Sequence, residues 1–177
     1  MTTQACIYFD EMESPIGPLT ILATEIGVCH IHFGRFEQGK AAVNAKIKKL
    51  GLKGNYVACH DSLDEVKHQL LQYFHGERQG FDISVDLHGT VFQKKVWQAL
   101  RDIEYGKTST YKLVAEQIGS PKAVRAIGGA NNQNPIPIII PCHRVIGSNG
   151  NMVGYGGGLD KKEALLHLEG VLIKQSS

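Results

Sequence analysis

The residues best suited to chemistry in this chain of 177 residues are Cys142, His143 and Arg144, which follow one another in the stretch PIPIIIPCHRVIG. The thiolate is the nucleophilic form of a cysteine, and a nearby imidazole can take the thiol proton. Three prolines should keep the preceding residues extended, so that the thiol ends a rigid run. Because neighbouring side chains of an extended segment point to opposite faces, His143 reaches the thiol only through a sharp turn or a water molecule.

A histidine that acts as a base needs a third group to hold its other nitrogen. The C-terminal segment DKKEALLHLEG predicts a helix and offers Glu163 and Glu169. Glu169 ends the apolar run, which favours it as the buried partner. With such partners the pKa of Cys142 is expected to fall below about 8.5. The alternative is that Cys142 is a small buried hydrophobic residue, the usual role of a free cysteine.

The segment before the thiol predicts two short helices joined by a tight turn. In TYKLVAEQIGSPKAVRAIGGAN, a first helix is expected over residues 111–118 with Leu113 inward, and a glycine ends it. Ser120 is expected to cap a second helix over residues 121–130, with Val124 inward. This arrangement is the helix-turn-helix, whose second helix usually contacts DNA.

The surface of the second helix is made of small residues. Ala123 and Ala126 leave room for close approach, and only Lys122 and Arg125 carry charge. Helices that read bases in the major groove usually present Arg, Asn or Gln for paired hydrogen bonds. A smooth face with one long arginine suits a phosphate backbone or a narrow groove instead. The competing interpretation is a pair of core helices that use small residues for tight packing.

The charges of the chain are divided unevenly. Residues 1–87 hold 8 Lys and Arg against 11 Asp and Glu, whereas residues 88–177 hold 11 against 6. The basic half therefore favours a polyanionic partner. No apolar run is long enough to span a membrane and no signal peptide is recognisable, so no membrane partner is expected. The four cysteines lack paired spacing, which is typical of free thiols in a reducing, cytoplasmic environment.

The whole pattern predicts an α/β fold of the α+β type, with two packed subdomains over residues 1–87 and 88–177. Short apolar stretches near the N-terminus and over residues 81–87 predict strands of a small antiparallel sheet. Helices are expected over residues 37–50, from Ser62 to about residue 75, and over 90–103. Ser62 and Glu65 have the spacing of a capping box. The second subdomain is expected to be mostly helical and winged-helix-like.

The stretches NPIPIIIPCHRVIGSNG and GYGGGLDKKEALLHLEG closely resemble the signature of the O6-alkylguanine-DNA alkyltransferases, or methylated-DNA–protein-cysteine methyltransferases. The resemblance is strong over residues 90–172 and weaker over the first 87. It implies that Cys142 attacks the alkyl carbon on O6 of a damaged guanine and keeps the group as a thioether, so that each molecule reacts once. It implies the same reaction, less efficiently, on O4-alkylthymine.

The resemblance also implies roles for the neighbours of Cys142. His143 would act through a water molecule, Glu169 would orient His143, and Asn134 would brace the turn. Tyr111 would press on the backbone phosphate and donate toward O6. The rest of the guanine pocket would consist of Pro137, Val145, Tyr155 and Gly156.

The implied partner is double-stranded DNA that contains O6-alkylguanine, bound from its minor-groove side by a monomer. Arg125 would enter the duplex in place of the flipped nucleotide, and the DNA contacts would include Lys122, Ala123, Ala126 and Tyr111. No cofactor is implied. Some relatives bind zinc in the N-terminal domain, but Thr24 and Cys29 stand where a cysteine and a histidine would be needed, so no metal is expected.

Two other functions compete with alkyl transfer. The first is a lesion-binding protein without transfer activity, similar to alkyltransferase-like proteins, which lack the cysteine; the presence of Cys142 opposes it. The second is a cysteine hydrolase or a redox-sensing regulator. A peptidase usually takes its base from far along the chain and its cysteine from the start of a helix, and residues 135–147 fit neither.

Overall fold

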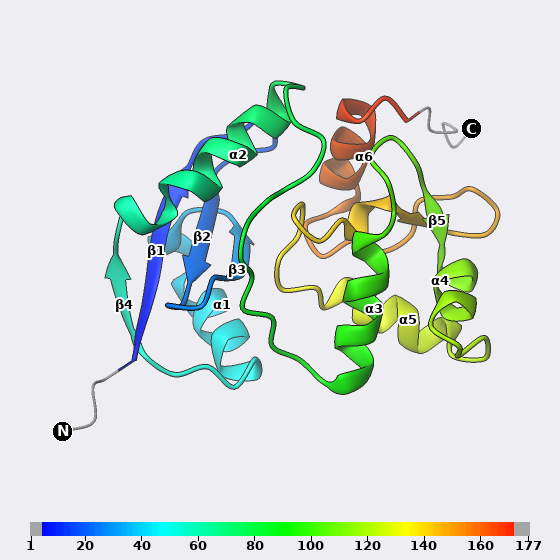
Figure 1. The fold of residues 1–177 in the computed structure, drawn as a ribbon, viewed down its shortest axis with the longest axis horizontal. Helices are drawn as coiled ribbons and strands as arrows, with labels where there is room; N and C mark the ends of the chain where they lie inside the picture. The colour runs from blue at the N-terminus through cyan, green and yellow to red at the C-terminus, as the bar shows by residue number, and fades with distance from the viewer. Residues whose placement is uncertain (1–4, 172–177) are drawn as a thin grey trace. The chain divides into compact units, whose positions relative to one another are not determined.

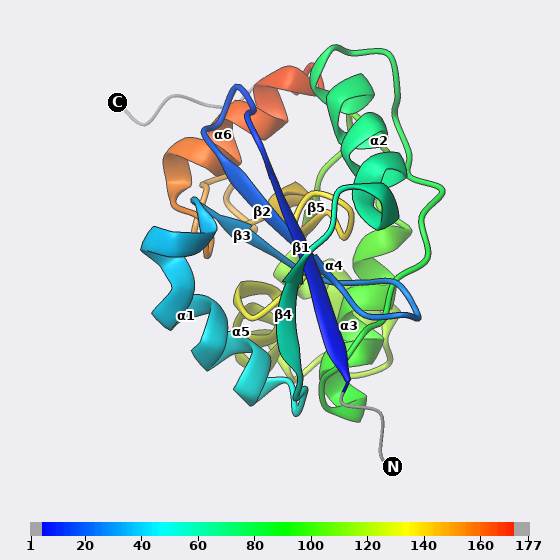
Figure 2. The ribbon, with the colours of Figure 1, turned by 90° about the vertical axis from the view of Figure 1, so that its left-hand side faces the viewer.

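A computed structural model describes residues 5–171 and divides the chain into two compact units, residues 1–88 and 89–177 (Figures 1 and 2). Within the described residues, no helix is both long enough and apolar enough to cross a lipid bilayer. The first unit contains a sheet and two helices, and the second is mostly helical. The predicted fold class is confirmed.

The first unit is built on a four-stranded sheet in the order β3-β2-β1-β4. Its strands are β1 (Cys6–Met12), β2 (Leu19–Ala23), β3 (Val28–Phe33) and β4 (Asn55–Ala58). The first three strands are antiparallel as expected, whereas β4 runs parallel to β1 and makes the sheet mixed. Most of β4 is exposed and shows no inward and outward alternation, which is why the sequence pattern did not reveal it.

Helices α1 (Phe36–Lys49) and α2 (Asp64–Phe74) lie on opposite sides of this sheet, as Figure 2 shows. The predicted helix over residues 37–50 is confirmed, and α1 buries Phe36, Val43 and Ile47 against the β1 and β2 side chains Ile7 and Leu22. Burial of such a stripe, rather than helix propensity alone, supplies most of the stability of a helix of this length.

The expected start of α2 is wrong. A 3-10 turn (Asp61–Leu63) precedes the helix, whose N-cap residue is Leu63 with no side-chain cap. The Ser62 side chain hydrogen-bonds the Cys59 thiol instead, and the Glu65 carboxylate accepts from Gln69 Nε2 at 2.7 Å. Neither side chain is therefore available to complete the predicted capping box.

The strand predicted over residues 81–87 is also wrong. This segment makes a single bridge, between Val85 and Val28 at the edge of the sheet. Two backbone hydrogen bonds hold it: Val28 N–H donates to Ser84 at 3.0 Å, and Asp86 N–H donates to Val28 at 2.8 Å. Pairing does not extend further, so the alternating pattern produces an extended connection rather than a strand.

The second unit begins with α3 (Val91–Arg101), inside the predicted range 90–103, and Thr90 and Gln93 form a reciprocal capping box at its start. The unit continues through β5 (Ser109–Thr110), α4 (Tyr111–Gln117), α5 (Val124–Asn132), β6 (Val145–Ile146) and α6 (Leu159–Leu168). The indole N–H of the fully buried Trp97 on α3 donates to the Ala130 carbonyl on α5 at 2.8 Å. This bond fixes the second helix of the helix-turn-helix against α3.

The helix-turn-helix is present, but two of its details differ from the expectation. Ser120 does not cap α5, because its carbonyl closes a turn with Ala123 N–H at 2.9 Å and the helix starts only at Val124. Leu113 and Val124, expected inward, are 53% and 38% exposed. Ile127, also expected inward, is fully buried, and Ala130 is buried with it.

The capping box of α3 gives the first prediction. Thr90→Ala removes the side-chain acceptor for Gln93 N–H, so it should destabilise the second unit by about 1 kcal/mol. Urea unfolding followed by the fluorescence of Trp97, the single tryptophan of the chain, measures this directly. The control Val91→Ala changes a neighbouring side chain that is 76% exposed and should stay within about 0.5 kcal/mol of the parent protein. Equal effects of both substitutions would contradict the prediction.

Candidate active site

The residues before Cys142 form two consecutive tight turns, not the rigid extended run that was expected. Ile139 N–H donates to the Pro137 carbonyl at 2.9 Å, and Cys142 N–H donates to the Ile140 carbonyl at 2.8 Å. Each bond closes a three-residue γ-turn. The first forces Ile138 to a φ of +74°, a conformation that a β-branched side chain strongly disfavours. The prolines therefore do not keep this segment extended. The negative φ that the proline ring imposes also fits the central position of an inverse γ-turn, which Pro141 occupies in the second turn.

Asn134 holds these turns together. Its Nδ2 donates to the Ile140 carbonyl at 2.8 Å, and its Oδ1 accepts from Ile136 N–H at 3.0 Å. Both bonds are buried. Cys142 follows directly, as the first residue of the 3-10 turn Cys142–Arg144.

The predicted partner of His143 lies within hydrogen-bonding distance. His143 Nε2 is 2.6 Å from Glu169 Oε2, and both side chains are completely buried. Glu169 is the C-cap residue of α6, so the end of this helix delivers the carboxylate to the 3-10 turn. The alternative candidate, Glu163, is instead 3.7 Å from His167 on the exposed face of α6. His143 Nδ1 is buried and has no hydrogen-bond partner among residues 5–171.

The environment of Cys142 corrects the expected acidity of the thiol. The residue is 3% exposed, and burial raises the pKa of its thiol to about 11, although contacts with Asn134, Lys162 and Tyr155 act in the opposite direction. The expected fall below the ordinary value is therefore wrong for the free protein. Desolvation penalises the thiolate more than the neighbouring donors stabilise it.

Sequence reasoning missed Lys162. This residue of α6 is completely buried, and its ammonium donates to the carbonyls of Val145 at 2.6 Å and Val153 at 3.1 Å. Burial lowers its pKa to about 8, and the Cys142 thiolate acts in the opposite direction. A helical signal was available, because Lys162 precedes the buried residues Leu165 and Leu166 by three and four positions and so shares their face.

Tyr111 and Asn131 contact the same region. The Tyr111 hydroxyl, at the start of α4, donates to the Val153 carbonyl at 2.8 Å. Burial raises the pKa of Tyr111, the Cys142 thiolate raises it further, and a hydrogen bond with Asn131 lowers it. Asn131 Nδ2 lies 3.4 Å from the Cys142 carbonyl. Tyr111 and Asn131 are thus neighbours of Cys142.

The other residues assigned to the guanine pocket take different positions. Pro137 and Val145, which lie close to Cys142 in the sequence, are both buried. Tyr155 is only 9% exposed. Gly156 faces the Asn132 carbonyl, which would lie 3.3 Å from an added Cβ. On the helix-turn-helix, Lys122, Arg125 and Ala126 are exposed, and Ala123 is half-buried as the N-cap residue of α5.

Thr24, one of the two residues considered for zinc, belongs to a polar cluster around Asp86. Thr24 Oγ1 donates to Asp86 Oδ2 at 2.5 Å, and His88 Nε2 is 2.8 Å from Asp86 Oδ1. Burial raises the pKa of the Cys29 thiol to about 12. Among residues 5–171, no three His, Cys, Asp or Glu side chains are grouped closely enough to hold a metal ion.

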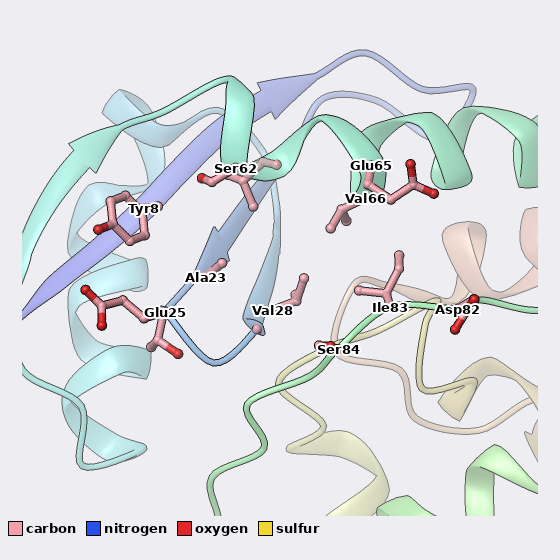
Figure 3. A pocket seen from close by; sticks show the side chains of 13 residues that line it. Tyr8, Ala23, Glu25, Val28, Ser62, Glu65, Val66, Asp82, Ile83 and Ser84 are labelled. Carbon is pink, nitrogen blue, oxygen red and sulfur yellow. The ribbon is translucent and has the colours of Figure 1, made fainter.

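A cavity of about 380 Å³ lies in the first unit, between the sheet, the start of α2 and residues 82–84 (Figure 3). Tyr8, Glu25, Glu65 and Asp82 are among the side chains that line it. None of the residues predicted to react or to contact DNA lines this cavity.

The second unit therefore combines a helix-turn-helix with a buried cysteine, and it carries a histidine that is paired with a carboxylate. This combination is typical of a DNA-binding domain that also carries a buried thiol. Family models agree with it. Residues 91–171 match the 6-O-methylguanine DNA methyltransferase DNA-binding domain, and residues 7–87 match the ribonuclease-like domain of the same proteins.

Individual relatives extend over almost the whole chain. A methylated-DNA–protein-cysteine methyltransferase of Methanosarcina acetivorans is 47% identical, over 93% of this chain and 99% of its own. The crystal structure of the O6-methylguanine methyltransferase of Mycobacterium tuberculosis is 41% identical and has a TM-score of 0.78, with 92% of each chain covered. The M. tuberculosis protein in complex with DNA is 40% identical, has a TM-score of 0.75 and covers 93% of this chain and 92% of its own.

The chain belongs to the O6-methylguanine-DNA methyltransferase family, as its sequence motifs predicted. It is a methylated-DNA–protein-cysteine methyltransferase, which binds DNA and repairs O6-methylguanine.

The burial of Cys142 gives the second prediction. In the free protein the thiol should stay protonated through neutral pH and ionise near pH 11, because burial penalises the thiolate. The Cβ carbon shift of Cys142, followed by NMR during a pH titration, measures the ionisation. Cys59 is an internal control, since hydrogen bonds from Ser62 lower its pKa below the ordinary value. A Cys142 midpoint below pH 9 would contradict the prediction.

Proposed function

We propose that Cys142 is the acceptor of the alkyl group. The observation that carries this proposal is the position of Cys142, which lies in the helix-turn-helix unit, immediately before a histidine that Glu169 holds at 2.6 Å. Cys142 Sγ forms a bond to the alkyl carbon, the bond between that carbon and O6 breaks, and its electron pair stays on the guanine. The thioether is stable, so each molecule reacts once.

The proton of Cys142 has a defined destination in this mechanism. His143 Nδ1 is buried and without a partner among the described residues, and burial lowers the pKa of His143 so that the imidazole is neutral at pH 7. A neutral imidazole with a bare nitrogen is a base. We assign the transfer of the thiol proton to this nitrogen through a bridging water molecule, with Glu169 as the group that orients the ring and Asn134 as the brace of the turn.

The departing guanine also requires stabilisation, because negative charge develops on its O6 and ring nitrogens. Tyr111 is the assigned donor toward O6, and its hydroxyl must then leave the Val153 carbonyl, 2.8 Å away. The backbone N–H of Gly156 is a second donor. Pro137, Val145 and Tyr155 are assigned to the walls of the pocket.

The helix-turn-helix is assigned to the minor groove. The exposed face of α5 has small residues beside Lys122 and Arg125, which suits close approach to a narrow groove. A guanine inside the duplex cannot reach a buried thiol, so the nucleotide must be flipped out at a cost of about a few kcal/mol. Arg125 would fill the space that the nucleotide leaves, with Lys122, Ala123 and Ala126 against the DNA backbone.

The remaining assignments concern the whole protein. Residues 88–177 would carry out DNA binding and alkyl transfer, and residues 1–87 would have a structural role. The protein would act in the cytoplasm as a monomer, without a cofactor or a metal, and would repair O4-alkylthymine less efficiently than O6-alkylguanine.

Mass spectrometry tests the acceptor directly. After incubation with a duplex that contains one O6-methylguanine, the peptide with Cys142 should gain one methyl group, and the reaction should stop at one equivalent. Cys142→Ser should abolish the transfer because a hydroxyl is a far weaker nucleophile than a thiolate, yet it should bind the duplex with unchanged affinity. Cys29→Ser, which changes the other buried cysteine, should react normally. Stoichiometric transfer by Cys142→Ser would refute the assignment.

The role of Arg125 gives a separate prediction. If Arg125 stabilises the flipped state, Arg125→Ala should slow repair of duplex DNA at least tenfold, corresponding to about 1.4 kcal/mol. The same variant should react normally with free O6-methylguanine, which needs no flipping. Arg101→Ala, on the exposed side of α3, is the control for lost charge. Equal losses on duplex and free base would show that Arg125 does not assist flipping.

A further inference from the structure

Arg144 has no part in the chemistry described above, yet its buried side chain makes three hydrogen bonds at the site. Its Nε lies 2.8 Å from Glu169 Oε1, and its second terminal nitrogen lies 3.1 Å from Glu169 Oε2. Its first terminal nitrogen donates to the Ile103 carbonyl at 2.6 Å. Its side chain is 7% exposed, and that of Glu169 is 0% exposed.

This bidentate contact fixes the charge of Glu169. A buried carboxyl group favours its neutral acid form, because desolvation penalises the anion. A guanidinium that grips both oxygens reverses this preference, since it supplies two charge-assisted hydrogen bonds and a full positive charge. Glu169 is therefore an ionised carboxylate, which accepts hydrogen bonds and donates none.

The charge of Glu169 in turn determines where the proton of His143 resides. His143 Nε2 lies 2.6 Å from Glu169 Oε2, and because the carboxylate can only accept, Nε2 must carry the hydrogen. In a neutral imidazole the other nitrogen is then bare. This other nitrogen is Nδ1, the buried atom without a partner among the described residues.

We propose that Arg144 is a positioning residue that sets the tautomer of His143 through Glu169 and so keeps Nδ1 available as the base. This inference rests on the proposed function, in which Nδ1 receives the proton of Cys142. Without Arg144, the buried Glu169 takes up a proton and donates its O–H to Nε2. The imidazole hydrogen then moves to Nδ1, and the base is lost although every atom of the Cys142, His143 and Glu169 side chains remains.

The other charged groups around the ring support a neutral imidazole. Burial lowers the pKa of His143, as do Arg144 and Lys162, whereas Glu169 raises it. One carboxylate therefore faces two buried cations, and a third positive charge on the imidazole is disfavoured. The tautomer, rather than the charge, is the variable that Arg144 controls.

Nitrogen-15 NMR of the histidine side chains distinguishes the two tautomers, because a protonated and a bare ring nitrogen have well-separated shifts. The chain has eight histidines, and the His143 signals are assigned by their loss in His143→Gln. In the parent protein at pH 7.5, the hydrogen should be on Nε2. A hydrogen on Nδ1, or a doubly protonated ring, would overturn the proposal whatever the variants show.

Variants of Arg144 test the cause. Arg144→Met removes the charge and should move the hydrogen to Nδ1 and slow methyl transfer by about a hundredfold, in the range expected for the loss of a general base. Arg144→Gln makes the same test while it keeps a donor for the Ile103 carbonyl, should the first variant not fold. Arg144→Lys restores a positive charge beside Glu169, so it should keep the hydrogen on Nε2 and retain most of the rate.

Tyr105→Phe is the matched control for structural loosening. The Tyr105 hydroxyl donates to the Leu168 carbonyl at 3.3 Å, and its ring lies 5.8 Å from the Arg144 guanidinium, so the substitution disturbs the same region but keeps the donors of His143 and Arg144 to Glu169. It should leave both tautomer and rate unchanged. A slow Arg144→Met or Arg144→Gln protein whose hydrogen remains on Nε2 would show a purely structural role and refute the proposal. Absence of methyl on Cys142 of the parent protein would refute the proposed function instead, and the tautomer result would stand.

Discussion

One buried carboxylate organises the reactive part of the second unit. Glu169 contacts His143 and Arg144 at once, and Arg144 also binds the carbonyl of Ile103, which follows α3. The carboxylate of Glu169 and the side chain of Arg144 therefore connect three parts of the unit: the end of α6, the segment after α3, and the turn that carries Cys142. Burying a carboxylate costs several kcal/mol unless its oxygens are fully bonded. The three donors to Glu169 meet this requirement and leave little freedom in the position of the imidazole.

Burial also keeps the Cys142 thiol protonated in the free protein. Cys142 and Cys29 are both buried, and burial raises the pKa of both thiols, to about 11 and about 12. Burial alone does not separate a reactive cysteine from an inert one. The difference lies in the neighbours, since Lys162, Asn134 and Tyr155 favour the thiolate of Cys142, whereas the nearby Asp86 disfavours that of Cys29. In the proposed mechanism the thiol ionises only with help from His143, so it is poorly reactive toward electrophiles in solution and the alkylated guanine must be brought to it.

The sequence revealed the family, the fold class and the pairing of His143 with Glu169, because these depend on local motifs and on helical periodicity. Prediction from the sequence failed where a hydrogen bond other than the expected one determined the local structure. Ser62 bonds Cys59 instead of capping α2, and residues 136–142 form γ-turns that no propensity predicts. It also failed at Lys162, because a lysine on an apolar face is normally assigned to solvent. The backbone carbonyls that bind this ammonium belong to β6 and to the segment before α6, whose positions are not encoded locally.

The central claim is that the alkyl group ends on a sulfur buried among the side chains of the second unit. Transfer of a carbon-13 methyl group from O6-methylguanine in duplex DNA, followed by NMR of the product, tests this most directly. The account predicts one S-methyl signal, with nuclear Overhauser contacts to the aromatic protons of Tyr155 and to the side-chain amide of Asn134. A mobile methyl signal without such contacts, or one attached to Cys6, Cys29 or Cys59, would contradict it.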